Sequence, residues 1–285
     1  MIWLIGNKGM LGTEVEKLLA RHKKNYVASD REIDITDRKS LREFADSRPI
    51  DWIINCAAYT AVDRAEDEPE PAFKINAEGP RHIAAVAADK KARLIHISTD
   101  YVFDGAKEEP CLETDQPNPA CVYGASKYQG ERDVASALPA HFIIRTAWLY
   151  GKDGPNFVTT MLRLFREKTE VTVVADQWGS PTYAVDLAEA IVRMIDADAT
   201  AYGIYHYTNA GKITWHDFAL AIYELAREKG LLDREVRVTP VATAQYPTKA
   251  RRPRCSYLAK DKICRNFAIS LKPWRESLAA FMATL

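Results

Sequence analysis

Short apolar runs alternate with longer segments of helical periodicity through the first half of the chain. The runs have the length of buried strands and lie at Trp3–Ile5, Tyr26–Ala28, Trp52–Asn55, Leu94–Ser98 and Phe142–Arg145. Two intervening segments, Leu11–Leu19 and Ala72–Ala88, repeat apolar residues at helical spacing. Alternating strands and helices predict an α/β fold built on a doubly wound parallel sheet with right-handed crossovers. Ligands of such sheets bind beyond the carboxyl ends of the strands.

The alternation of strands and helices becomes less regular after Tyr150, and a loop is predicted at Gly151–Pro155. Helical spacing returns near Phe157–Arg166, Val185–Ile195, Trp215–Lys229 and Trp274–Leu285. We expect residues 1–150 to form the domain that contains the sheet. Residues 151–285 should form mainly a smaller C-terminal substrate-binding lobe, with some segments returning to the first domain.

Composition and charge narrow the class of protein. With 285 residues, of which 47% are hydrophobic and 27% charged, the chain can bury the core of a soluble globular protein. Its 39 basic and 39 acidic residues balance, so nothing favours nucleic acid or an anionic membrane as a partner. No stretch approaches the roughly 20 apolar residues of a membrane helix, and the apolar N-terminus is too short for a signal peptide. We therefore expect a cytoplasmic protein.

Cysteine and histidine spacing gives no sign of a metal site. The five cysteines include no C-x-x-C pair, and the six histidines include no H-E-x-x-H arrangement. Reduced thiols are the expected state, and zinc-hydrolase chemistry has no support.

Three glycines, Gly6, Gly9 and Gly12, follow the first strand directly and open the first helix. Glycine at these positions lets the backbone turn sharply and approach a pyrophosphate, which rests on the N–H groups of the helix start. The alternative is a tight turn that needs glycine for packing alone. The position of the motif between strand and helix favours a Rossmann-type NAD(P)-binding domain over residues 1–150.

The end of the second strand carries Asp30, near the usual place of an acid that bonds the adenosine ribose. Arg31 follows it, and Lys8 lies within the glycine turn; both cations would favour a ribose 2′-phosphate. NADPH and NADH are therefore both plausible cofactors. The alternative is that Asp30 and Arg31 form an ordinary solvated turn.

The sharpest chemical signal is Tyr123-Gly124-Ala125-Ser126-Lys127 at the start of a predicted helix. Residues four apart share a helical face, so we expect the Lys127 ammonium to lie near the Tyr123 phenol and lower its pKa. Such a phenol suits general acid–base catalysis. The Y-x-x-x-K pattern is common by chance, but here it follows a strand that ends in Ser98-Thr99. A Thr99 hydroxyl at this edge can donate a hydrogen bond to a carbonyl under reduction, whereas Ser98 is expected to be structural.

With these motifs, the chain resembles the dTDP-4-dehydrorhamnose reductase family of extended short-chain dehydrogenases over almost its whole length. The similarity lies in Gly6–Gly12, Asn55–Asp63, Asn76-Ala77, Ser98–Gly105, Tyr123–Lys127, Arg145–Trp148, Asp176–Thr182 and Arg252-Pro253. The Ser98–Phe103 and Asp176–Thr182 runs are specific to this family rather than general features of dinucleotide-binding folds.

The resemblance implies hydride transfer from NADPH or NADH to the C4 ketone of dTDP-4-dehydro-L-rhamnose. Catalysis would rest on Thr99, Tyr123 and Lys127. The cofactor would be bound by Gly6, Lys8, Gly9, Met10, Leu11, Asp30, Arg31, Asp34, Ile35, Ala57, Ala58, Tyr59, Asn76, Tyr123 and Lys127. The sugar nucleotide would be bound by Val62, Asp100, Tyr101, Trp148 and Arg252. Trp148 could equally be an ordinary core residue.

The chain departs from the family at one position. Some relatives bind magnesium between subunits through carboxylates, one of which matches Glu14, while another falls where this chain has Val185. Valine cannot ligate a hard cation, and Asp186 points in another direction along the helix. Glu14 alone is expected to be a solvated carboxylate near the positive end of the helix dipole. We therefore expect no metal, and a monomer or a metal-independent homodimer.

Three alternatives remain. A generic carbonyl reductase would have no reason to carry the Asp176–Thr182 run. Another nucleotide-sugar reductase or epimerase would use the same tyrosine and lysine. A regulatory relative that binds cofactor without turnover is a different class, against which the intact Thr99, Tyr123 and Lys127 argue.

Overall fold

The computed structural model describes residues 1–285 and is organised around a parallel sheet of six strands. The strand order is β10-β5-β4-β3-β1-β2, so the chain passes outward from β1 to β2 and then returns to β3 on the other side. The six strands are β1 (Ile2–Ile5), β2 (Tyr26–Ser29), β3 (Trp52–Asn55), β4 (Arg93–Thr99), β5 (His141–Thr146) and β10 (Gly203–His206). The predicted Rossmann-type, doubly wound sheet is confirmed, with the reversal of strand order between β1 and β3.

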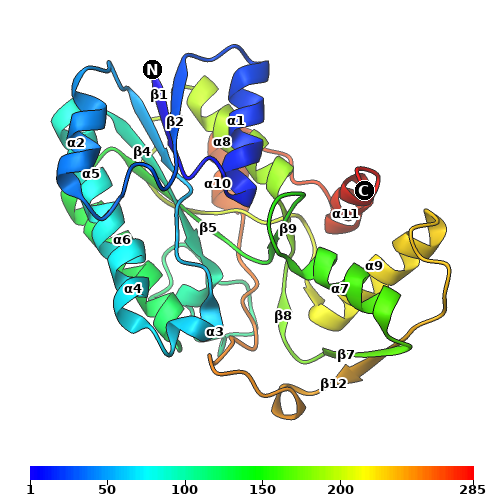
Figure 1. The fold of residues 1–285 in the computed structure, drawn as a ribbon. Coiled ribbons are helices and arrows are strands. Elements are labelled where there is room, and N and C mark those ends of the chain that lie inside the picture. Colours follow the sequence, from blue (N-terminus) through cyan, green and yellow to red (C-terminus); the bar gives the residue numbers. More distant parts are fainter.

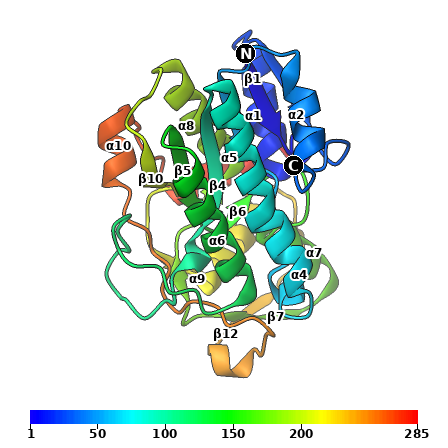
Figure 2. The same cartoon turned by 90° about the vertical axis from the view of Figure 1, so that its left-hand side faces the viewer.

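Helices cover both faces of this sheet (Figure 1). One face carries α1 (Met10–Arg21), α8 (Ala184–Asp196) and α10 (Asp261–Phe267), and Leu11, Val15 and Ile191 belong to its apolar core. The other carries α2 (Arg38–Asp46), α5 (Gly79–Lys90) and α6 (Val122–Ala137), with Leu41, Ile83 and Val134 in a second core. Figure 2 shows this second set of helices in front of the sheet.

A smaller lobe with its own core lies beyond the carboxyl ends of the strands (Figure 1). Its helices are α7 (Phe157–Glu167), α9 (Trp215–Glu228) and α11 (Trp274–Met282). Short two-stranded ladders connect them, formed by β6 (Leu149–Tyr150) with β9 (Thr182–Tyr183), β8 (Trp178–Gly179) with β11 (Ile213–Thr214), and β7 (Glu170–Val174) with β12 (Arg237–Val241).

The chain after residue 150 contributes to both halves of the molecule. Helix α8 packs on α1, and β10 extends the sheet beside β5. A buried polar cluster anchors α11 to this region, because Asp186 accepts hydrogen bonds from Asn209 at 2.7 Å, Ser277 at 2.5 Å and Lys272 at 2.8 Å. The smaller lobe is therefore tied to the sheet domain by buried hydrogen bonds as well as by the chain itself.

Local structure differs from the sequence expectation in two ways: strand β10 and helices α2 and α10 were not predicted, and one predicted helix is divided. The predicted helix over Ala72–Ala88 is divided into α4 (Pro69–Phe73), a π-helical turn at Lys74–Glu78 and α5. Proline at the start of α4 and again at the start of α5 sets these boundaries. The remaining short elements are α3 (Val62–Ala65) and 3₁₀ turns at Asp100–Val102 and Thr243–Gln245. No helix has both the length and the apolar character needed to span a membrane.

Candidate functional site

In the glycine turn between β1 and α1, the backbone of the helix start lies very close to the backbone of the turn. Gly6 has a φ of +81°, and a Cβ on Gly12 would lie 2.0 Å from the Gly6 carbonyl oxygen, so only glycine fits this close approach of helix to turn. Gly9 is the N-cap of α1, and no side chain caps the helix there. The first N–H groups of α1, including those of Met10 and Leu11, therefore fit the pyrophosphate of a dinucleotide.

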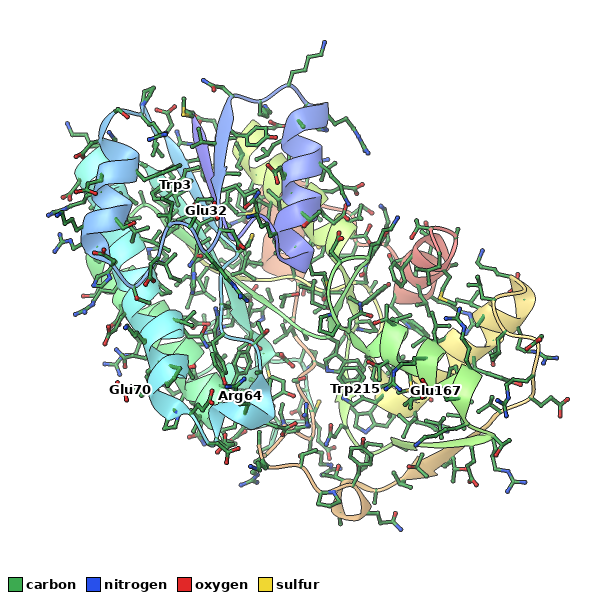
Figure 3. All side chains as sticks on the ribbon, viewed as in Figure 1. Trp3, Glu32, Arg64, Glu70, Glu167 and Trp215 are labelled. Carbon is green, nitrogen blue, oxygen red and sulfur yellow. The ribbon has the colours of Figure 1, made fainter.

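The end of β2 lies beside this turn, since Ser29 accepts a backbone hydrogen bond from Gly6. Of the two predicted cations, Lys8 is paired with Glu32 at 3.6 Å, and Arg31 is exposed just after the strand. The Asp30 N–H donates to the same carboxylate at 2.7 Å, and this bond is the main reason that the Glu32 pKa is lowered. Sequence reasoning missed Glu32, which is labelled in Figure 3.

Two further residues predicted to bind cofactor follow β2. The Asp34 carboxylate accepts hydrogen bonds from the N–H and the hydroxyl of Thr36, each at 2.8 Å, and its pKa is lowered as a result. Ile35 is buried, with its side chain against Gly79. The Ile35 side chain is thus committed to packing on α5.

A buried amide connects the end of β3 to α6. Asn76 accepts a hydrogen bond from the Tyr59 N–H at 2.8 Å and donates to the Tyr59 carbonyl and the Ser126 hydroxyl, each at 3.0 Å. At the start of the same segment, the Ala57 N–H donates to Asn55 at 3.0 Å. These bonds fix the Ala57–Tyr59 backbone beside Gly6, whose missing Cβ would lie 2.7 Å from the Ala57 nitrogen.

Helix α6 is held close to the end of β4, which places Tyr123 at the carboxyl edge of the sheet. A Cβ on Gly124 would lie 2.2 Å from the Tyr101 carbonyl oxygen, so glycine permits this approach. The Val122 N–H donates to Glu66 at 2.8 Å, and the sulfur of Cys121 accepts from Gly124 at 3.4 Å. Both contacts cap the helix start.

Thr99, Asp100 and Tyr123 converge at this edge. The Thr99 hydroxyl donates to the Asp100 carboxylate at 3.0 Å. Desolvation raises the pKa of Tyr123 above its usual range, and a hydrogen bond with Thr99 only partly opposes it. Asp100 is 2% exposed, and burial raises its pKa to about 6, opposed mainly by the Ser256 and Thr99 hydroxyls. The arrangement offers a protonated phenol and a threonine hydroxyl side by side, and Ser98 is buried in the strand below.

Lys127 does not behave as predicted. Its ammonium donates to the carbonyl oxygen of Ile97 in β4 at 2.6 Å, and burial lowers its pKa to about 8. The predicted lowering of the Tyr123 pKa by Lys127 is wrong for this geometry, because the desolvation of the phenol outweighs other influences. Burial therefore brings the pKa of Lys127, and not that of Tyr123, close to physiological pH.

Arg252 connects Tyr101, another predicted substrate-binding residue, to Asp63. Its guanidinium donates to the Tyr101 hydroxyl at 2.9 Å and to the Asp63 carboxylate at 2.8 Å. The Tyr101 ring in turn meets the Tyr123 ring edge to face, with centroids 5.6 Å apart. Asp63 follows Val62 at the start of α3 and was not predicted as a site residue, although the Asn55–Asp63 run contains it.

Trp148 is neither a plain core residue nor a free surface residue. Its side chain is partly exposed, and its ring stacks on Trp215 with centroids 3.6 Å apart. The backbone has a φ of +49°, which costs a residue with a side chain roughly 1–2 kcal/mol. Figure 3 shows Trp215 at the side of the smaller lobe that is nearest the sheet domain.

The two positions considered for a metal lie in different surroundings. Glu14 sits in the second turn of α1, its side chain is 14% exposed, and it accepts a hydrogen bond from Lys17 at 2.8 Å. The prediction of a solvated carboxylate at the helix start is therefore wrong, since Lys17 and neighbouring side chains cover it. Val185 is partly buried and packs against the core of the smaller lobe.

Comparison with known proteins places this site in context. The family described as RmlD substrate binding domain matches residues 1–285. A dTDP-4-dehydrorhamnose reductase from Aggregatibacter actinomycetemcomitans is 41% identical over 281 residues, 96% of each chain. A dTDP-4-keto-6-deoxy-D-glucose reductase from Streptomyces niveus is 39% identical over 97% of this chain and 94% of its own. The crystal structure of dTDP-4-dehydrorhamnose reductase from Bacillus anthracis in complex with NADP has a TM-score of 0.94 and 38% identity, covering 100% of this chain and 99% of its own.

Proposed function

Since the chain belongs to the RmlD substrate binding domain family, we propose that it is a reductase of a nucleotide-linked keto sugar. It uses NADPH or NADH to reduce the C4 ketone of dTDP-4-dehydro-L-rhamnose and gives dTDP-L-rhamnose. The relative from A. actinomycetemcomitans carries the name of this activity. The observation that carries the proposal is the convergence of Thr99, Tyr123 and Lys127 at the carboxyl end of β4.

The residues of this chain divide the chemistry among them. When bound, the nicotinamide cofactor supplies the hydride that becomes the new C4–H bond. The C=O electron pair moves to oxygen, and the Tyr123 hydroxyl donates the proton that completes the alcohol. A raised pKa keeps this phenol protonated at neutral pH, as a proton donor requires. The Thr99 hydroxyl, which donates to Asp100 in the structure, would turn its one hydrogen to the same substrate oxygen. The Lys127 ammonium would hold a hydroxyl of the nicotinamide ribose.

A second candidate substrate is dTDP-4-keto-6-deoxy-D-glucose, the 4-keto sugar named in the S. niveus relative. The same Thr99, Tyr123 and Lys127 would reduce it, so the two differ in the sugar that the smaller lobe accepts. Loss of NADPH absorbance should be followed with dTDP-4-keto-6-deoxy-D-glucose alone, and then with the 3,5-epimerase that converts it to dTDP-4-dehydrorhamnose. Turnover only after epimerase is added supports the first substrate. Turnover without epimerase supports the second, and no turnover in either arm refutes both.

The cellular location and the oligomeric state are also part of the proposal. We place the protein in the cytoplasm, acting as a monomer or as a homodimer that needs no metal. Size-exclusion chromatography with light scattering, with and without EDTA, separates these assemblies from a metal-bridged dimer.

A further inference from the structure

The Trp148 backbone is held in a left-handed conformation by one residue of the Asp176–Thr182 run. The Thr182 N–H donates to the Trp148 carbonyl at 3.2 Å, and the Thr182 hydroxyl donates to the Ala147 carbonyl at 2.7 Å. A left-handed residue other than glycine is uncommon, and such strain persists only where the surroundings enforce it. Thr182 supplies part of that enforcement.

Gly179, in the same run, makes room for the Trp148 ring. A Cβ on Gly179 would lie 2.8 Å from Cε2 and from Cζ2 of that indole, and 3.0 Å from its Nε1. Gly179 does not have a positive φ, so space rather than backbone freedom explains the glycine. The run that distinguishes the family thus forms a slot into which the edge of the Trp148 ring fits.

Trp215 covers one face of the Trp148 indole. The two indoles lie 12° from parallel, and Phe157 packs against Trp215 with centroids 4.6 Å apart. The β8–β11 ladder positions Trp215 beside Trp148, because Ile213, two residues before Trp215, pairs with Gly179. Thr214 then caps α9, because its hydroxyl accepts the Asp217 N–H at 3.0 Å. The helix therefore starts at Trp215, beside Gly179.

We propose that Gly179, Thr182 and Trp215 are positioning residues that hold the Trp148 indole as a preformed platform for the sugar ring of the substrate. The proposal rests on the function proposed above. Trp148 lies two residues beyond Thr146, which pairs with Thr99 in the β4–β5 ladder. Platform and proton-donating groups therefore stand at the same edge of the sheet. One indole face is covered by Trp215, and the partly exposed remainder can pack on the apolar C–H face of a deoxysugar.

The test compares Trp215→Ala with Trp215→Phe, measuring kcat and KM for the 4-keto sugar nucleotide and the Kd for NADPH. Losing the aromatic pair should raise the KM of the alanine variant roughly 3- to 10-fold, with kcat and the Kd for NADPH close to wild type. The phenylalanine variant keeps an aromatic face and should restore most of the affinity. Trp274→Phe is the matched control, because Trp274 packs on Phe218 and Gly211 in the same lobe, and its KM should not change.

Gly179→Ala adds one methyl group and tests the slot if Trp215→Ala does not fold. It should displace the indole and raise KM without changing the Kd for NADPH. Wild-type KM in Gly179→Ala, and in Trp215→Ala if that variant folds, overturns the proposal while an active wild-type enzyme leaves the reductase function intact. A wild-type protein that reduces neither 4-keto sugar overturns the reductase function, and this proposal with it.

Discussion

The ammonium of Lys127 donates a hydrogen bond to the main-chain carbonyl of Ile97 at 2.6 Å. This contact ties the catalytic helix α6 to the strand that carries Thr99 two residues later. Because the ammonium is buried, its pKa falls to about 8, and Glu131 one turn further along the helix only partly opposes the shift. The charge needed to hold a ribose hydroxyl is thus maintained at neutral pH but lost under mildly alkaline conditions.

The pH dependence of reduction should follow Lys127. The group is charged below its pKa and neutral above it, so kcat/KM should fall as the pH rises through about 8, well below the usual lysine range. Initial rates from pH 6 to 10 measure this. Lys127→Arg is the control, since arginine stays charged, and its residual activity should vary little over that range. A wild-type profile that is level to pH 10 would contradict the role given to Lys127.

Cofactor preference should depend on the charges at the end of β2. Arg31→Ala should weaken NADPH roughly 3- to 10-fold while leaving NADH nearly unchanged, because only NADPH carries the 2′-phosphate. Glu32→Gln should act in the opposite direction by removing a carboxylate beside Lys8. Fluorescence titration with each cofactor measures both effects. Arg38→Ala, an exposed position in α2, is the control. An equal loss for NADH and NADPH in Arg31→Ala would show that Arg31 does not contact the phosphate.

Asp63 should support substrate binding through Arg252. Asp63→Asn keeps the shape but removes the charge that pairs with the guanidinium, so KM for the sugar nucleotide should rise about two- to fivefold. Arg252→Gln should raise it roughly 10- to 100-fold, since a charged donor to the substrate is lost. Lys249→Gln breaks only the exposed neighbouring pair with Asp67 and serves as the control. Unchanged KM in Arg252→Gln would remove Arg252 from the substrate site.

Turnover should not require a divalent cation. Valine at position 185 offers no ligand, and the Glu14 carboxylate is already paired with Lys17. We expect full activity after exhaustive treatment with EDTA and no stimulation by added Mg²⁺. Activity that disappears with the chelator and returns only with Mg²⁺ would show that other carboxylates of the chain bind the metal.

Local patterns in the sequence were enough to predict five of the six sheet strands and the glycine turn after the first of them. The strands that begin near Trp3 and Trp52 are short apolar runs, and Tyr123 and Lys127 are close in sequence, so spacing reveals them. The turn after the first strand can be recognised in the sequence because few residues other than glycine fit such a backbone. These features depend on a few neighbouring residues.

Contacts between distant segments could not be predicted in this way. Glu32 meets Lys8 only because β2 lies beside β1, and Asp63 meets Arg252 only because a segment 189 residues further along the chain returns to α3. The direction of the Lys127 pKa shift could not be predicted from the sequence either, because it depends on burial rather than on the distance to Tyr123. Trp148 remained ambiguous because its stacking partner, Trp215, is far away in the chain.

The central claim is that the Tyr123 hydroxyl supplies the proton to the sugar oxygen. Single-turnover reduction of dTDP-4-dehydrorhamnose, with NADPH bound, should be about 10²–10⁴ times slower in Tyr123→Phe, with little change in the Kd for NADPH. Tyr128→Phe is the control, because that phenol lies on the same helix and contacts only Gln116 through its oxygen. Wild-type single-turnover rates in Tyr123→Phe would contradict the account.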